Sequence, residues 1–122
     1  MAPGGRNMPM TGSMNLLKGT LDVLVLKTLS WGPLHGYAVS RFIRESTADV
    51  LTVEEGALYP ALKRLENKGW LESTWGLTDT NREARFYELT DEGKAQLERE
   101  LGDWQRYVEA MSRVLFEARP AP

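Results

Sequence analysis

Residues 53–70, "VEEGALYPALKRLENKGW", combine cationic, aromatic and small side chains in a pattern suited to contacting a nucleic acid. Lys63 and Arg64 can pair with phosphates, and an arginine can also bridge guanine through two hydrogen bonds. Tyr59 offers a hydroxyl to a phosphate and a flat ring to a sugar edge. Gly56 and Ala57 are small enough to let a backbone come close. The alternative is a solvated helix face, which is the usual role of such charges.

The same segment is expected to be a helix with one irregular turn. Leu58, Leu62 and Leu65 recur at helical spacing. Thr52 and Glu55 match the Ser/Thr-x-x-Glu capping box, which predicts a start near residue 53, and Gly69 is a suitable C-terminal cap. Pro60 would lie near the start, where fewer backbone bonds are lost, and its ring could face a thymine methyl. The residues expected to face DNA are Glu55, Gly56, Ala57, Tyr59, Pro60, Lys63 and Arg64.

Catalysis is not expected from this chain. His35 is the only histidine and there are no cysteines, so neither a metal site nor a catalytic triad can be assembled around them. No glycine-rich phosphate loop or nucleophile elbow occurs. We therefore expect no enzyme activity, no metal and no cofactor, and we assign His35 a capping or hydrogen-bonding role at the start of the second helix.

The 122 residues are enough for one domain with one core. The net charge of −2 is unevenly distributed: residues 91–118 hold seven acidic and four basic side chains, and the rest holds ten and eleven. A strongly basic domain is thus excluded, but a locally basic face is not. The absence of cysteine, of a signal peptide and of an apolar run long enough for a membrane predicts a cytoplasmic protein.

The remaining elements follow from periodicity and turn signals. Residues 16–29 are apolar on nearly all sides, which predicts a buried helix. The segment "SWGPLHG" predicts a turn, and residues 37–45 return to helical spacing. The segments "WLESTW" and "ARFYEL" predict an antiparallel hairpin with "GLTDTNRE" as its loop. Thr90 then offers an N-cap to a final helix that spans about residues 91–118.

The final helix predicts a homodimer. Its apolar residues are spaced 4, 3, 4, 3 and 4 apart, which is a heptad seam that can hold a partner helix over about 27 Å. A compact domain of this size could hardly cover such a stripe alone. The interface residues are expected to be Leu97, Leu101, Trp104, Val108, Met111 and Leu115.

The predicted fold is mainly α with a small antiparallel β-hairpin, that is, a winged helix-turn-helix followed by a long C-terminal dimerisation helix. The expected divisions are a flexible leader at residues 1–14, the winged helix-turn-helix DNA-binding domain at 15–90, the dimerisation helix at 91–118 and a tail at 119–122. Over residues 17–104 the sequence resembles the PadR family of bacterial transcriptional regulators. The resemblance rests on "GPLHGY", "LYPALKRLE" and "YELTDEG" in this order.

The resemblance implies a homodimeric repressor that binds a pseudo-palindromic operator and releases it on binding a small molecule. Its single C-terminal helix is similar to that of the short PadR subgroup. A winged-helix module that binds only proteins remains the alternative. Arg82 and Arg85 of the hairpin, and Tyr37 of the second helix, are further candidates for DNA contact, although a solvent-exposed or packing role is open for each.

Trp104, with Val108 beside it, is a candidate site for a planar aromatic effector. Multidrug-responsive relatives within the family suggest this possibility. The simpler interpretation is that the indole of Trp104 contributes buried area to the dimer core.

Overall fold

The computed structural model describes residues 14, 16 and 19–121. The predicted leader therefore lies outside the described residues except for Met14, whose N–H donates to the Val50 carbonyl at 2.7 Å. The elements are α1 (Leu21–Leu29), β1 (Leu34–His35), α2 (Gly36–Ser46), α3 (Glu55–Asn67), β2 (Leu71–Leu77), β3 (Glu83–Leu89), α4 (Asp91–Ser112) and the π-helical end η2 (Arg113–Glu117).

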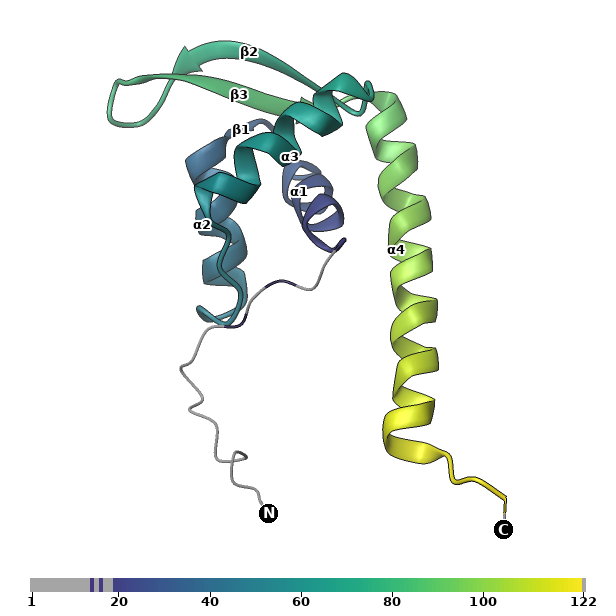
Figure 1. Ribbon diagram of the computed structural model, residues 1–122. Helices are drawn as coiled ribbons and strands as arrows, with labels where there is room; N and C mark the ends of the chain where they lie inside the picture. The colour runs from purple at the N-terminus through teal and green to yellow at the C-terminus, as the bar shows by residue number, and fades with distance from the viewer. Residues whose placement is uncertain (1–13, 15, 17–18, 122) are drawn as a thin grey trace.

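The first three helices gather beneath the sheet, and α4 runs along one side of them (Figure 1). The core joins the helices to the sheet and consists of Val25, Leu26, Leu29, Val39, Ile43, Leu58, Leu62, Leu65, Leu71, Tyr87, Leu89 and Leu97. The mainly helical winged-helix fold predicted from the sequence is confirmed. In the described part of the chain, no helix is long and apolar enough to cross a membrane.

The predicted hairpin is present, but it belongs to a three-stranded antiparallel sheet with the order β1-β3-β2. The short strand β1 was expected to be part of a turn, and it pairs Leu34 with Tyr87 of β3. Two residues are too few to show an alternating pattern, so only packing of Leu34 on the core reveals this strand. The hairpin strands also reach further than predicted, to Leu77 and from Glu83, which leaves residues 78–82 as the turn.

Two helix starts differ from the prediction. The first helix begins at Leu21, and Gly19, two residues before it, has a left-handed φ of +87° that a helix does not adopt. The predicted capping box at Thr52 is wrong, because α3 begins at Glu55 with Glu54 as N-cap and no side-chain capping bond. Val53 packs against the core from an extended segment, and the helix therefore starts further along the chain than predicted.

The junction between α3 and α4 is built as the sequence predicts. Gly69 has a φ of +83° directly after the end of α3. The Thr90 hydroxyl donates to the Gly69 carbonyl at 2.7 Å and accepts from the Gly93 N–H at 3.0 Å, so it caps α4 and ties it to the end of α3. A Cβ at Gly93 would collide with the Trp70 carbonyl, so the close approach requires glycine there.

Candidate nucleic-acid interface

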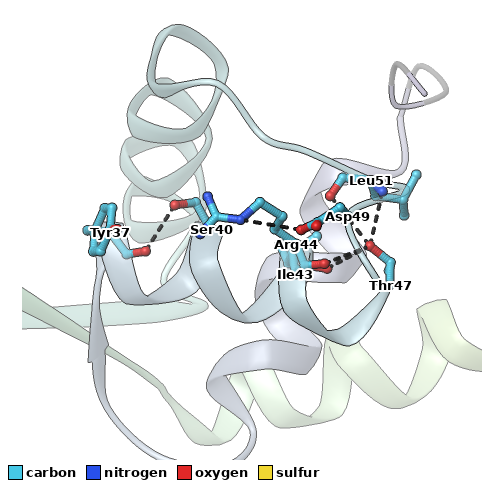
Figure 2. Close-up of polar contacts among 7 residues, drawn as sticks. All are labelled: Tyr37, Ser40, Ile43, Arg44, Thr47, Asp49 and Leu51. Atoms are coloured by element: carbon cyan, nitrogen blue, oxygen red, sulfur yellow. Dashed lines mark hydrogen bonds and ion pairs between the residues drawn. The ribbon is translucent and has the colours of Figure 1, made fainter. Parts of the chain in front are cut away.

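The end of α2 and the loop that follows it are held by side-chain bonds of Thr47 and Arg44 (Figure 2). The Thr47 hydroxyl donates to the Ile43 carbonyl and accepts from the Leu51 N–H, both at 3.0 Å. Arg44 pairs with Asp49 at 3.7 Å across the turn. These local bonds order the loop that leads toward α3.

One face of α3 is buried, and the opposite face is open. Leu58, Ala61, Leu62 and Leu65 are at most 1% exposed and anchor the helix to the core. The predicted contact residues Glu55, Gly56, Ala57, Pro60 and Lys63 are all exposed. Asn67 lies on the same open face by helical spacing and was missed, although its amide could have been identified from its position four residues after Lys63.

Tyr59 lies at the edge of this face and packs over the start of α2. A Cβ built on Gly36 would lie 2.7 Å from Cε1 of Tyr59, so the ring occupies the space that a side chain at Gly36 would take. The ring nevertheless stays 45% exposed. The adjacent Tyr37 is also exposed, and the Arg41 guanidinium lies 5.6 Å from its ring centroid.

Arg64 is exposed but not free. Its Nη2 lies 2.6 Å from Oδ1 of Asp22 on α1, so the guanidinium already has an anionic partner. The sequence could not show this pair, because the two residues are 42 positions apart. Among the described residues Lys63 has no ion-pair partner, which leaves it as the available cation in the middle of the open face.

Arg85 is also held within the molecule. Its Nε donates to the Ser73 hydroxyl at 2.9 Å, and its Nη2 lies 3.9 Å from Oε2 of Glu66 on α3. The Ser73 hydroxyl in turn donates to the same Glu66 oxygen at 2.7 Å. Burial, and then the Glu66 carboxylate, raise the pKa of the neighbouring Tyr87 above its ordinary value. Arg85 therefore joins the wing to α3, a role that sequence reasoning did not foresee.

Arg82 is placed at the wing tip, opposite the start of α2. It borders an open groove of about 500 Å³ together with His35, Tyr37, Arg41, Thr78, Asp79, Thr80, Glu83 and Ala84. Asp79 and Glu83 offset the charges of the two arginines, so this groove has no clear preference for an anion. Nδ1 of His35 is buried without a hydrogen-bond partner in the described structure, in place of the capping bond that we expected.

The predicted seam of α4 divides into two parts. Leu97 is 5% exposed in the chain's own core, and Leu101 packs against that core. Trp104, Val108 and Met111 of α4 are exposed, and so is Leu115 of η2. The α-helix predicted to reach about residue 118 ends at Ser112, and the π-helical turn of η2 follows it. Trp104 and Leu101 also border an apolar cavity of about 400 Å³ with Met14, Leu16, Thr20, Val23, Leu24, Lys27 and Leu51. Val108, which we grouped with Trp104, does not line this cavity.

The sequence model of the "Transcriptional regulator PadR-like family" matches residues 25–99. "Negative transcriptional regulator PadR" of Bacillus subtilis is 31% identical over 84 residues, which are 69% of this chain and 44% of that protein. This chain thus spans less than half of the length of that relative.

Among the solved structures that share the fold, two illustrate the similarity. A transcriptional regulator from Clostridium thermocellum is 28% identical with a TM-score of 0.74, over 80% of this chain and 95% of that one. A PadR family transcriptional regulator from Eggerthella lenta is 30% identical with a TM-score of 0.70, over 83% of this chain and 86% of that one.

Proposed function

This chain belongs to the PadR-like family of transcriptional regulators, which are DNA-binding proteins and not enzymes, and from this premise we propose that two copies bind one operator through their α3 helices. The observation that carries the proposal is the open face of α3, anchored from behind by four buried side chains and presenting Gly56, Pro60 and Lys63 outward. Small residues at its N-terminal end allow that end to enter a major groove.

The exposed half of the α4 seam supports dimerisation. Trp104, Val108, Met111 and Leu115 are each at least 40% exposed. Large apolar side chains repeated along one helix face gain most by packing against a second helix. A symmetric pair would present two α3 helices to two half-sites, which matches a pseudo-palindromic operator. The division into a DNA-binding domain at residues 15–90 and a dimerisation helix at 91–118 is part of this proposal.

Repression that is relieved by a small molecule is the finer part of the proposal. The B. subtilis relative is named a negative regulator, and the cavity beside Trp104 is apolar and large enough for a planar compound. A ligand there would touch α1, which carries the carboxylate bound to Arg64. Ligand binding would thereby be coupled to whether the Arg64 guanidinium is paired with Asp22 or available to DNA. A cytoplasmic location, expected from the sequence, goes with this function.

A module that binds only proteins is the competing function, and the capture of Arg64 and Arg85 by carboxylates favours it. The two functions differ in their response to salt. Sites selected from random duplex DNA should bind with an affinity that falls as salt rises. If each subunit places two to four cations on phosphates, the log–log slope should be about −4 to −7.

The test is the double variant Lys63→Ala with Arg64→Ala, which should flatten this slope and leave the dimer intact. Lys94→Ala with Arg99→Ala is the matched control, because it removes the same two charges from the exposed side of α4. No salt-sensitive DNA binding by the unaltered protein would support the protein-binding module, whereas equal slopes for both variants would mean that Lys63 and Arg64 do not contact phosphates.

A further inference from the structure

The wing carries an exposed tryptophan with a cation fixed above it. Trp75 of β2 is 69% exposed, and the Arg85 guanidinium lies 5.5 Å from its ring centroid. Leu77, two residues further along the same strand face, is 62% exposed. A contiguous exposed apolar patch beside polar side chains can mark an interaction surface.

The pair formed by Trp75 and Arg85 is connected to α3. The alternation of β2 places Leu71, Ser73, Trp75 and Leu77 on one face. Leu71 lies in the core, and Ser73 donates to Glu66 of α3, so that face looks toward α3. Arg85, which stands opposite Trp75 in the register, is bound to Ser73 and Glu66. Trp75 therefore continues the α3-facing surface outward along the wing, under a cation whose position is set by α3.

The Trp75–Arg85 pair places a cation beside an exposed aromatic ring near the middle of the wing, and Glu66 is a partner of the same guanidinium. Arg85 faces the ring, and Lys63 extends from the open face of α3. The wing tip is less suitable, because Asp79 and Glu83 offset Arg82 there. An aromatic plate beside an arginine suits the edge of a nucleic-acid backbone, where an apolar sugar alternates with a phosphate.

We propose that Trp75 is a DNA-contacting residue whose ring packs on the deoxyribose edge of the duplex next to the groove that receives α3. Glu66 is its positioning residue: through Ser73 and Arg85 it sets the place of the cation above the ring. The proposal rests on the proposed DNA-binding function and is continuous with the same surface. The sequence analysis placed the DNA contact of the hairpin at Arg82 and Arg85. The proposal places it at Trp75, in the middle of the wing.

The first test compares Trp75→Ala with Trp31→Ala on a selected operator. Trp31 is the matched control, because it is 74% exposed and also lies beside a cation, Lys27, but follows α1 and precedes β1 at the opposite edge of the sheet. Trp75→Ala should weaken binding about tenfold, the scale of losing an aromatic contact with a nucleic acid. Trp31→Ala should stay within about twofold of the unaltered protein.

The second measurement shortens the duplex. A wing contact lies outside the base pairs read by α3, so removing the flanking base pairs should weaken the unaltered protein and abolish its advantage over Trp75→Ala. The midpoint of thermal unfolding should be equal for both proteins, since the side chain is exposed. A loss of affinity that persists on the shortened duplex would overturn the assignment.

The positioning role is tested at Glu66. Glu66→Ala should reproduce most of the loss seen for Trp75→Ala on the long duplex, and Glu66→Gln, which keeps an acceptor for Ser73, should recover most of the affinity. The double variant Glu66→Ala with Trp75→Ala should bind no more weakly than Trp75→Ala alone, because both act through one contact. Additive losses would overturn the positioning role.

Failure of this proposal can be separated from failure of DNA binding itself. If the unaltered protein binds the operator and the two tryptophan variants bind equally well, only the role of Trp75 is refuted. If the unaltered protein binds no duplex, the proposed function fails first, and Trp75 with it.

Discussion

Arg64 of α3 and Asp22 of α1 form an ion pair, with 2.6 Å between guanidinium and carboxylate. The pair joins the helix proposed to enter DNA to the helix that borders the apolar cavity through Val23 and Leu24. A phosphate approaching α3 would have to compete with Asp22 for the guanidinium. The pair thus links the open face of α3 to the helix that borders the cavity.

Replacing Asp22→Asn should tighten operator binding, because it releases Arg64 to phosphate without removing a cation. The log–log salt slope should steepen by up to about one unit per subunit. The free energy of unfolding should change by less than about 1 kcal/mol, because both partners are partly exposed. Fluorescence anisotropy over a salt series measures both affinity and slope. Weaker binding with an unaltered slope would mean that Asp22 positions Arg64 and does not compete for it.

Gly36→Ala should lower operator affinity by displacing Tyr59. The added Cβ would meet the tyrosine ring at 2.7 Å, closer than two carbon atoms can pack. The loss should be roughly tenfold, on the scale of one recognition contact. Gly102→Ala is the control, because a Cβ there has nothing within 4 Å. In a Tyr59→Leu background the effect of Gly36→Ala should shrink; an undiminished effect would show that the helix, not the ring, had moved.

Trp104→Asp and Met111→Asp should each give a folded monomer. Both side chains are about 41% exposed along the α4 seam, so a carboxylate there opposes packing against a second copy without disturbing the core. Light scattering after gel filtration reports the mass, and operator affinity should fall because one half-site loses its partner. Gln105→Asp, one residue from Trp104 and off the seam, should remain dimeric. A monomer with full operator affinity would contradict the dimeric mode of binding.

Thr90→Ala should destabilise the fold by about 1–2 kcal/mol, because it removes the cap of α4 together with the bond to the Gly69 carbonyl. Thr90→Ser keeps the hydroxyl and should lose much less. Urea unfolding gives the free energy of each variant, with an unchanged m-value expected. Equal stability of the alanine and serine variants would mean that the hydroxyl contributes little.

The local signals in the sequence predicted most of the framework. Thr90 capping α4 and Gly69 ending α3 depend on neighbours a few residues away, and both are confirmed. The capping box at Thr52 was wrong because packing of Val53 outweighed a local preference. Strand β1 was missed because a strand of two residues is too short to show the alternating pattern of buried and exposed side chains.

The site was less predictable than the framework. The exposed face of α3 followed from the spacing of its leucines, but the partners of its arginine did not. Asp22 approaches Arg64 only after α1 and α3 have packed, and Glu66 meets Arg85 only after the wing has folded over α3. A cation in a sequence shows a possible contact, whereas its availability depends on carboxylates brought close by tertiary structure.

The Thr90 hydroxyl binds the Gly69 carbonyl after α3 on one side and the start of α4 on the other, so it links the orientations of the two helices. In a dimer, the angle at which two copies of α4 cross would then dictate the distance between the two copies of α3. A compound bound beside Trp104 could release an operator by opening that angle, because the two α3 helices would then no longer match the helical repeat of the duplex. Control of transcription would then need no unfolding and no direct competition for DNA.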